Sequence, residues 1–457
     1  MPSIVVERHI PVRMRDGVTL RADVYRPSEG GPYPVALCRT PYSKDATQPT
    51  VQPIRLAEAG YVVVVQDVRG RWASEGDFGY IAQMLDEGRD GYDTIEWAAA
   101  LPYSNSAIGT FGLSYLGQVQ WMAAFESPPH LMAIAPTQIT SDFTQGLTHR
   151  GGALEYGLCL RWLLSVALGD VARRAQTSAA SPAESLAEAR AVAAELDGLC
   201  DGGFHRAPLA SLPALERLGL DDLVERIVQW GPAHHREETL ARRSKVTLPA
   251  LCIAGWYDCF QQGALDDYVA LRRNGSPARL LVGPWGHGSG MTTSAIGDVD
   301  FGVASSAMSL ELVGDLTSLH VRWFDRWLKG IDNGLDREPP VRLFVMGENR
   351  WTSLPDWPPP TTPRRLYLHS TGSASWSPPR PDAPARSYLY DPTQPSPTLG
   401  GNTLLPGNYP WGVRDQRPLS LRPDVLTFVS GPVEQPLTIA GRVSADLCVA
   451  SSAPDTD

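Results

Sequence analysis

The sequence is poor in cysteine and has no long apolar run. Six cysteines are spread over 457 residues without a C-x-x-C pair, which argues against a structural zinc site and against a disulfide framework. No run of 18 apolar residues occurs, so we predict no membrane-spanning helix. The N-terminal residues MPSIVVERHI lack the charged and apolar regions of a signal peptide. These absences predict a cytoplasmic protein with reduced thiols and no membrane partner.

Basic residues are also scarce relative to acidic ones. The chain has 40 Lys and Arg against 50 Asp and Glu, a formal net charge of −10 at pH 7. No basic block could neutralise phosphates, so we exclude nucleic acid as a partner. The 43% hydrophobic and 20% charged residues are typical of a globular protein, and the length allows roughly two to four domains.

Strand and helix signals alternate over residues 1–141 and again over 237–353. The four valines at 62–65 are typical of a strand buried on both faces, and residues 115–125 have the pattern of a helix. The alternation predicts one discontinuous α/β domain with a mainly parallel sheet. Residues 142–236 have helical spacing instead, and we expect a helical cap inserted over the sheet. A helical subdomain with only a packing role is the alternative.

The composition changes again at residue 354. Residues 354–410 are rich in proline, and short strand patterns occur within them and as far as 451. Short strands punctuated by Gly and Pro predict a jelly-roll-like β domain over 354–457. A disordered proline-rich linker is the alternative for 354–410. Because few residues follow for a closed sandwich, we expect the β domain to be incomplete.

The strongest chemical signal is a serine between small residues. Ser114 lies in GTFGLSYLG, after a predicted strand and before a predicted helix. This context is that of a nucleophile elbow, in which a sharp turn presents the serine hydroxyl at the top of a sheet. Gly112 fits such a turn. The general pattern also has glycine two residues after the serine, where this chain has Leu116, so a structural serine is the alternative.

A nucleophilic serine needs a base and an acid that orients the base. In α/β-hydrolases the order along the chain is Ser, then Asp or Glu, then His. Asp258 and His287 each follow a predicted strand and satisfy that order. We therefore predict a triad of Ser114, Asp258 and His287. Among the other histidines, His234 and His235 form a metal-like pair, but adjacent residues of a helix face different directions and no acidic or thiol pattern lies nearby, so we expect neither a metal nor another cofactor.

An oxyanion hole needs two hydrogen-bond donors. The backbone N–H of Tyr115 is one candidate, because it follows the nucleophile. The second donor comes from the loop after an early strand, where Tyr42 is the candidate. From chemistry alone, a packing role for Tyr42 is equally open. We interpret the polar stretch 67–76 as structural support for these loops, with substrate contact as the alternative.

Several motifs together resemble one family. They are R-T-P-Y at 39–42, D-V-R-G-R-W-A-S-E-G at 67–76, G-L-S-Y-L-G at 112–117, G-W-Y-D at 255–258 and G-P-W-G-H at 283–287. The chain resembles the cocaine esterase / X-Pro dipeptidyl-peptidase hydrolases over nearly its whole length, and is most similar to the cocaine esterase branch. The resemblance implies an α/β-hydrolase domain, an inserted helical domain and a C-terminal jelly roll. It implies the same triad, the same oxyanion hole, and a possible homodimer.

The resemblance also implies part of a substrate pocket. Trp162 and Phe260 are similar to members of an aromatic box that binds the acyl group, with plain core packing as the alternative for each. A third aromatic member corresponds to Leu147 here, so we expect a reshaped acyl pocket.

These observations predict a serine hydrolase that cleaves a small-molecule carboxylic ester through an acyl-enzyme. Two alternatives stay open. One is an amide hydrolase, either a β-lactam acylase or an X-Pro dipeptidyl-peptidase. The other is a non-catalytic binding protein that uses its jelly roll.

Overall fold

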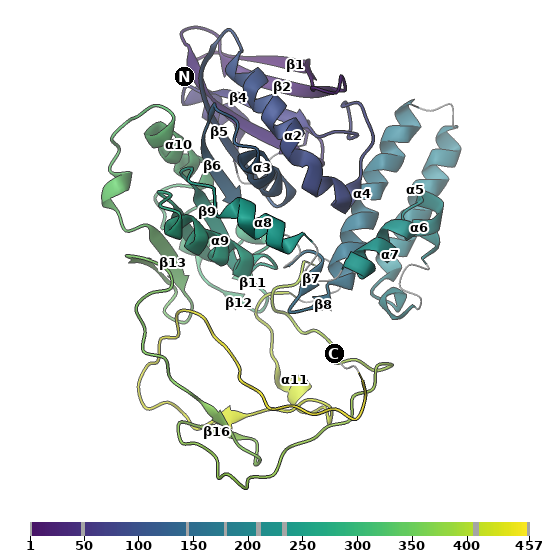
Figure 1. The fold of residues 1–457 in the computed structure, drawn as a ribbon, viewed down its shortest axis with the longest axis vertical. Coiled ribbons are helices and arrows are strands. Elements are labelled where there is room, and N and C mark those ends of the chain that lie inside the picture. The colour runs from purple at the N-terminus through teal and green to yellow at the C-terminus, as the bar shows by residue number, and fades with distance from the viewer. Residues whose placement is uncertain are drawn as a thin grey trace.

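A ten-stranded mixed sheet forms the centre of the molecule (Figure 1). The computed structural model describes residues 2–46, 51–142, 146–177, 181–206, 212–230, 235–404 and 411–454. The strand order is β1-β2-β4-β3-β5-β6-β9-β10-β13-β14. Their bounds are β1 (Ile4–Arg13), β2 (Thr19–Pro27), β3 (Tyr33–Thr40), β4 (Val62–Asp67), β5 (Ser104–Leu113), β6 (Leu131–Thr137), β9 (Leu251–Tyr257), β10 (Arg279–Gly286), β13 (Val341–Val345) and β14 (Arg350–Leu354).

The middle of this sheet is parallel, as the sequence predicts. Strands β4, β3, β5, β6, β9, β10 and β13 pair in parallel, and antiparallel pairs occur at both edges, in β1–β2 and β13–β14. Every residue of β4 is buried, which confirms a strand covered on both faces. Parallel strands leave all their carboxyl ends at one edge, where loops from distant parts of the chain meet.

Helices cover both faces of the sheet. α2 and α3 pack together and lie in front of it in Figure 1, whereas α1 contacts α10. The helices outside the helical block are α1 (Pro53–Glu58), α2 (Tyr80–Ala99), α3 (Tyr115–Phe125), α9 (Gln261–Arg273) and α10 (Leu316–Trp327). Asp315 caps α10 by accepting a bond from the Ser318 N–H.

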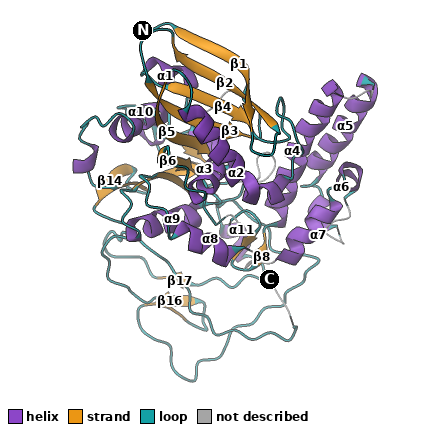
Figure 2. Cartoon of the chain, turned by 45° about the horizontal axis from the view of Figure 1, so that its top comes forward, coloured by secondary structure: helices purple, strands orange, loops and turns teal. Residues whose placement is uncertain are grey.

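Helices also dominate the residues between β6 and β9, as the sequence predicts. Four of them, α4 to α7, form a group beside the sheet in both views, whereas α8 lies next to α9 (Figure 1, Figure 2). Ser181 and Glu184 form a capping box at the start of one of them, α5. The helices are α4 (Tyr156–Thr177), α5 (Pro182–Gly198), α6 (Pro213–Leu218), α7 (Asp221–Trp230) and α8 (Arg236–Arg243).

The C-terminal part is largely extended loops, drawn at the bottom of Figure 1. Its regular elements are a three-stranded sheet of β15 (Tyr367–Leu368), β16 (Ser373–Ser375) and β17 (Val429–Ser430), and the helix α11 (Arg417–Ser420). The strand expected near residues 437–451 is wrong for this structure: residues 431–454 contain no strand. Val443 and Val449 there are 80% and 84% exposed, because no described strand pairs with this segment.

Shorter elements complete the described chain. They are β7 (His149–Arg150), β8 (Ala153–Leu154), β11 (Ala295–Ile296), β12 (Val299–Asp300), and the 3₁₀ turns Gly203–His205, Gly288–Met291, Val303–Ser305 and Leu335–Arg337. Across the described ranges, no helix combines the length and apolar character needed to cross a membrane.

Candidate active site

Ser114 occupies a sharp turn between a strand and a helix. Strand β5 ends at Leu113 and helix α3 begins at Tyr115, and Ser114 between them has φ 62° and ψ −126°. A left-handed backbone is strained for a residue with a side chain. Gly112 makes the turn possible, because a Cβ there would lie 2.4 Å from the Cβ of Leu116. The turn therefore has the sharp geometry that the sequence predicts.

His287 and Asp258 form a buried hydrogen-bonded pair. His287 follows β10, Asp258 follows β9, and His287 Nδ1 lies 2.7 Å from Asp258 Oδ1. The carboxylate side chain is 0% exposed and the imidazole 8%. A carboxylate at Nδ1 fixes the ring tautomer that carries its proton there, which leaves Nε2 as a proton acceptor.

The three predicted residues lie at one edge of the sheet. β5, β6, β9 and β10 are successive neighbours and run parallel, so their carboxyl ends come together. Among the described residues, no hydrogen bond joins Ser114 to His287; the Ser114 side chain is hydrogen-bonded to Tyr42 instead. Catalytic hydrogen bonds are often long or misaligned without substrate.

Tyr42 presents its hydroxyl to the serine turn. The indole Nε1–H of Trp162 donates a 2.9 Å hydrogen bond to Tyr42 Oη. Desolvation of the phenol raises the pKa of Tyr42, so the hydroxyl stays protonated at neutral pH. A protonated hydroxyl whose oxygen already accepts from Trp162 can donate to a second oxygen, which is the capability required of an oxyanion donor.

The Tyr115 side chain is held by a hydrogen bond at its hydroxyl and by an indole stacked on its ring. Its ring is 1% exposed, and its hydroxyl donates a 2.8 Å bond to Glu87 Oε1. Glu87 in turn forms a 2.8 Å ion pair with Arg39, also buried. The indole of Trp162 stacks on the Tyr115 ring with centroids 6.2 Å apart and planes 10° apart. These contacts fix the start of α3, where the Tyr115 N–H lies.

The polar stretch 67–76 supports the Tyr42 loop. Arg71 Nε and Trp72 Nε1 both donate to the carbonyl of Pro41, at 2.8 and 2.9 Å. Arg71 is itself paired with Asp170 of α4. Two bonds on the residue before Tyr42 hold that loop beside the serine turn, which supports the structural interpretation of this stretch.

Phe260 packs against the imidazole of His287. Its side chain is buried, and the two ring centroids lie 5.5 Å apart at a steep angle. Leu147, the aliphatic replacement expected in the acyl pocket, is also buried at 4% exposure. A role for Phe260 and Trp162 in binding substrate stays a prediction.

Two residues of the site were missed by the sequence analysis. Gln138, directly after β6, bonds to Gly286 and Gly288 on either side of His287, and Glu87 supports Tyr115. No motif marks either residue. Their partners lie far away in the sequence, so only the tertiary structure brings them together.

Asp258, Cys259 and His287 also place potential metal ligands within 4.8 Å of one another. Burial raises the pKa of the Cys259 thiol well above its usual value, and the nearby Asp258 carboxylate raises it further. The carboxylate already bonds the imidazole, so these two groups are engaged with each other. The donor set therefore fits a hydrogen-bonded pair better than a metal site.

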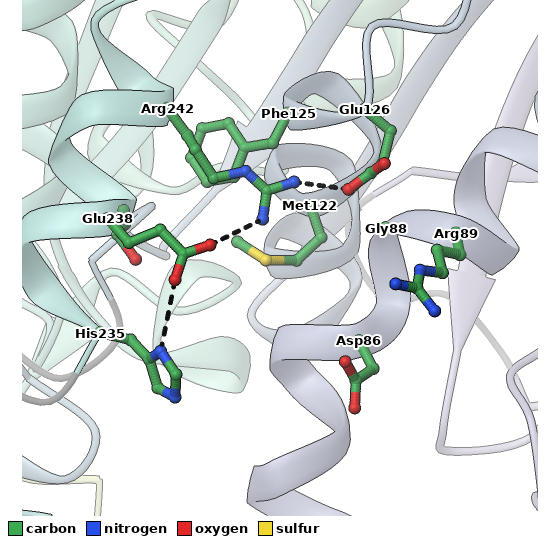
Figure 3. Close-up of a pocket in the computed structure, with 10 residues that line it drawn as sticks. Asp86, Gly88, Arg89, Met122, Phe125, Glu126, His235, Glu238 and Arg242 are labelled. Atoms are coloured by element: carbon green, nitrogen blue, oxygen red, sulfur yellow. Dashed lines mark hydrogen bonds and ion pairs between the residues drawn. The ribbon is translucent and has the colours of Figure 1, made fainter.

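A separate pocket lies between α2, α3 and α8 (Figure 3). It encloses about 220 Å³, and Arg242 at its wall is paired with Glu126 at 2.5 Å and packs over Phe125. None of the predicted site residues lines it. Its lining residues are Asp86, Gly88, Arg89, Met122, Phe125, Glu126, His235, Glu238, Thr239 and Arg242.

Two family models match the chain. One, described as X-Pro dipeptidyl-peptidase (S15 family), matches residues 16–289. The other, described as the X-Pro dipeptidyl-peptidase C-terminal non-catalytic domain, matches residues 333–457. The first covers the serine turn and both Asp258 and His287, and the second covers the C-terminal loops and short strands.

Similar proteins point the same way. Cocaine esterase from Rhodococcus sp. (strain MB1 Bresler) is 37% identical over 470 residues, which cover 99% of this chain and 79% of that protein. The structure of an α-amino acid ester hydrolase matches with a TM-score of 0.70 and 24% identity, covering 96% of this chain and 74% of the other. An aminopeptidase from a marine sediment Thaumarchaeota archaeon matches with a TM-score of 0.69 and 23% identity, with the same coverage. The two structural matches show the fold.

Proposed function

The chain belongs to the X-Pro dipeptidyl-peptidase (S15) family and is a serine ester hydrolase, and from this premise we propose that Ser114, His287 and Asp258 carry its chemistry. The observation that supports this assignment best is the buried 2.7 Å bond between His287 and Asp258, at the same sheet edge as Ser114. This bond orients an imidazole whose free Nε2 can accept a proton.

The proposed reaction proceeds in two halves. His287 Nε2 takes the proton of the Ser114 hydroxyl while Oγ attacks the ester carbonyl carbon. The tetrahedral intermediate collapses, His287 protonates the leaving alcohol, and the acyl group stays on Ser114. Water then attacks the acyl-enzyme with His287 again as base, and the carboxylic acid leaves. Asp258 stabilises the charged imidazole throughout.

The Tyr42 hydroxyl and the Tyr115 N–H are the proposed oxyanion hole. The raised pKa of Tyr42 keeps its proton available, and the contacts of Tyr115 with Glu87 and Trp162 hold its backbone in place. Fixed donors stabilise the developing negative charge without reorganising. Removing one such donor typically lowers kcat by about 10²–10³-fold.

We propose uncharged acyl groups as the substrate class. Binding a free α-amine would require a carboxylate that has no cation of its own. Three carboxylates near the proposed site are each paired with an arginine: Glu87 with Arg39, Asp170 with Arg71, and Glu155 with Arg150. Of the others nearby, Asp258 bonds His287, and the buried Asp67 accepts bonds from the backbone N–H groups of Lys44 and Ala73. A small-molecule ester whose acyl group carries no charge therefore fits the site better than a dipeptide with a free amino terminus.

The helical residues 142–236 are proposed as a cap on the α/β domain formed by 1–141 and 237–353, with 354–457 as the β domain. α4 of this cap brings Trp162 to Tyr42 and Tyr115, which supports a role in the site. A homodimer and a cytoplasmic location stay predictions from the sequence.

Ser114→Ala tests the assignment. We expect p-nitrophenyl acetate hydrolysis to fall at least 10³-fold and labelling by a fluorophosphonate probe to disappear, because both need the Ser114 oxygen. Ser244→Ala, which removes a surface hydroxyl bonded to the Ala241 carbonyl, is the matched control. Undiminished hydrolysis by Ser114→Ala would overturn the triad, and a folded wild-type chain that takes no label would favour a non-catalytic binding protein.

A substrate panel tests the ester class. Phenyl acetate, a phenylglycine ester and an X-Pro anilide are compared by kcat/KM. The proposed function predicts the highest value for the neutral ester. A preference for the anilide would favour the amide-hydrolase alternative, to which the X-Pro dipeptidyl-peptidase description of the matching family lends weight.

A further inference from the structure

Gln138 joins the strands that carry the site. It directly follows β6, is 0% exposed, and has φ 47°, a left-handed backbone that is unusual for a residue with a long side chain. Its backbone N–H donates a 2.7 Å bond to the carbonyl of Ile253 in β9. This bond fixes the backbone position from which the Gln138 side chain projects.

The amide of Gln138 binds the backbone on both sides of His287. Nε2 donates to the Gly286 carbonyl at 2.7 Å, and Oε1 accepts from the Gly288 N–H at 2.8 Å. Turning the amide over would place oxygen against oxygen and N–H against N–H, so these partners define a single orientation. Gly255 of β9 leaves room for this arrangement, because a Cβ there would lie 3.0 Å from Gln138 Nε2.

The residue before Gln138 holds the serine turn. The Ser114 N–H donates a 2.9 Å bond to the carbonyl of Thr137. Two consecutive residues thus connect the backbone at Ser114 to the backbone that flanks His287. The regular pairing of β10 with β9 is interrupted between Gly283 and Gly286, so the His287 turn depends on such side-chain bonds.

We propose that Gln138 is a positioning residue that sets the place of His287 relative to Ser114. Asp258 fixes the imidazole at its Nδ1 side, and Gln138 fixes the backbone from which the imidazole projects. The inference rests on the proposed triad. Because reactions of this kind are sensitive to displacements of about 1 Å, we expect the loss of both Gln138 side-chain bonds to lower kcat by about 10–100-fold.

Gln138→Met removes both bonds with little change in side-chain volume. The expected result is a kcat for p-nitrophenyl acetate about 10–100-fold below wild type, with KM within about twofold, because the acyl pocket is untouched. Asn274→Leu is the matched control: it removes an amide that bonds the carbonyls of Arg243 and Val246, away from the site, and we expect wild-type kcat.

Gln138→Glu adds a readout that a merely structural role would not give. A protonated carboxyl can replace the amide, since its O–H donates to Gly286 and its C=O accepts from Gly288, whereas the carboxylate repels the Gly286 carbonyl. Burial raises the pKa of such a carboxyl. The ratio of variant to wild-type kcat should therefore rise as pH falls from 8 to 5, while the ratio for Gln138→Met stays constant.

The outcomes separate this inference from the proposed function. A folded Gln138→Met with wild-type kcat, or a Gln138→Glu ratio that does not change with pH, overturns the positioning role. If Gln138→Met fails to fold, the pH series of Gln138→Glu decides. Full activity of Ser114→Ala would instead overturn the triad itself.

Discussion

The indole N–H of Trp162 donates a 2.9 Å hydrogen bond to the hydroxyl oxygen of Tyr42. This bond uses a lone pair on the Tyr42 oxygen and leaves the Tyr42 proton for another acceptor. The sequence resemblance places Trp162 in an acyl-binding box. In the proposed mechanism this bond gives Trp162 a second task, which is to orient the Tyr42 hydroxyl as an oxyanion donor.

Trp162→Phe should therefore lower kcat rather than only weaken binding. We expect a fall of about tenfold, smaller than the roughly 10²–10³-fold fall for Tyr42→Phe, because the Tyr42 hydroxyl is disoriented but still present. The loss should be similar for acetyl, butyryl and benzoyl esters. Tyr33→Phe, which removes a hydroxyl bonded to the Glu29 carbonyl, is the control. A change confined to KM, and dependent on acyl size, would leave Trp162 with a binding role alone.

Glu87→Gln should destabilise the protein strongly. Glu87 and Arg39 form a buried ion pair at 2.8 Å, and the substitution leaves the Arg39 charge without its counter-ion. Breaking such a pair from one side costs about 3–5 kcal/mol. Urea unfolding measures the loss. Asp332→Asn breaks the exposed pair with Arg337 and should leave the unfolding midpoint unchanged. Equal stability of Glu87→Gln and wild type would contradict a structural role for the pair.

His320 should make folding sensitive to acid. Burial lowers the pKa of His320 in α10 to about 4, from an ordinary value of 6.5. The unfolded chain therefore takes up a proton at a higher pH than the folded chain, so stability falls as pH decreases from about 6.5 toward 4. The loss from this group between pH 6.5 and 4.5 is about 2 kcal/mol.

His320→Phe removes the titrating group and keeps an aromatic ring beside Phe111 and Phe324. Urea unfolding at pH 6.5 and 4.5 should show a smaller acid loss for this variant than for wild type. His130→Phe changes a half-exposed histidine on the surface and serves as the comparison. An equal acid loss in His320→Phe and wild type would show that other groups account for the pH dependence.

The serine turn could be predicted because its geometry is encoded locally. Gly112 and the small residues around Ser114 mark a strand that turns at once into a helix, and the structure has that turn. Asp258 and His287 could be placed because each follows a strand of a parallel sheet, where carboxyl ends share an edge. In these cases a short stretch of sequence determines the local structure.

Gln138 and Glu87 could not be predicted, because their partners are distant in sequence and carry no pattern of their own. Gln138 bonds the backbone of residues 286 and 288, and a glutamine after a strand gives no sign of such a partner. The strand expected near 437–451 failed for a related reason. Alternating apolar residues indicate a preference for the extended conformation, but a stable strand also needs a neighbouring strand to pair with. Among the described residues, no strand pairs with this segment.

The position of Trp162 on α4 has a consequence for engineering. Exchanging the helical residues between relatives is an obvious route to new acyl specificity, because these residues supply the predicted pocket wall. In this chain the same exchange would also remove the donor that holds the Tyr42 oxygen and the ring that covers Tyr115. An exchange of these helices would therefore change the acyl specificity and the turnover rate together. A chimaera that keeps the wild-type rate must retain, at position 162, an indole that donates a hydrogen bond to Tyr42.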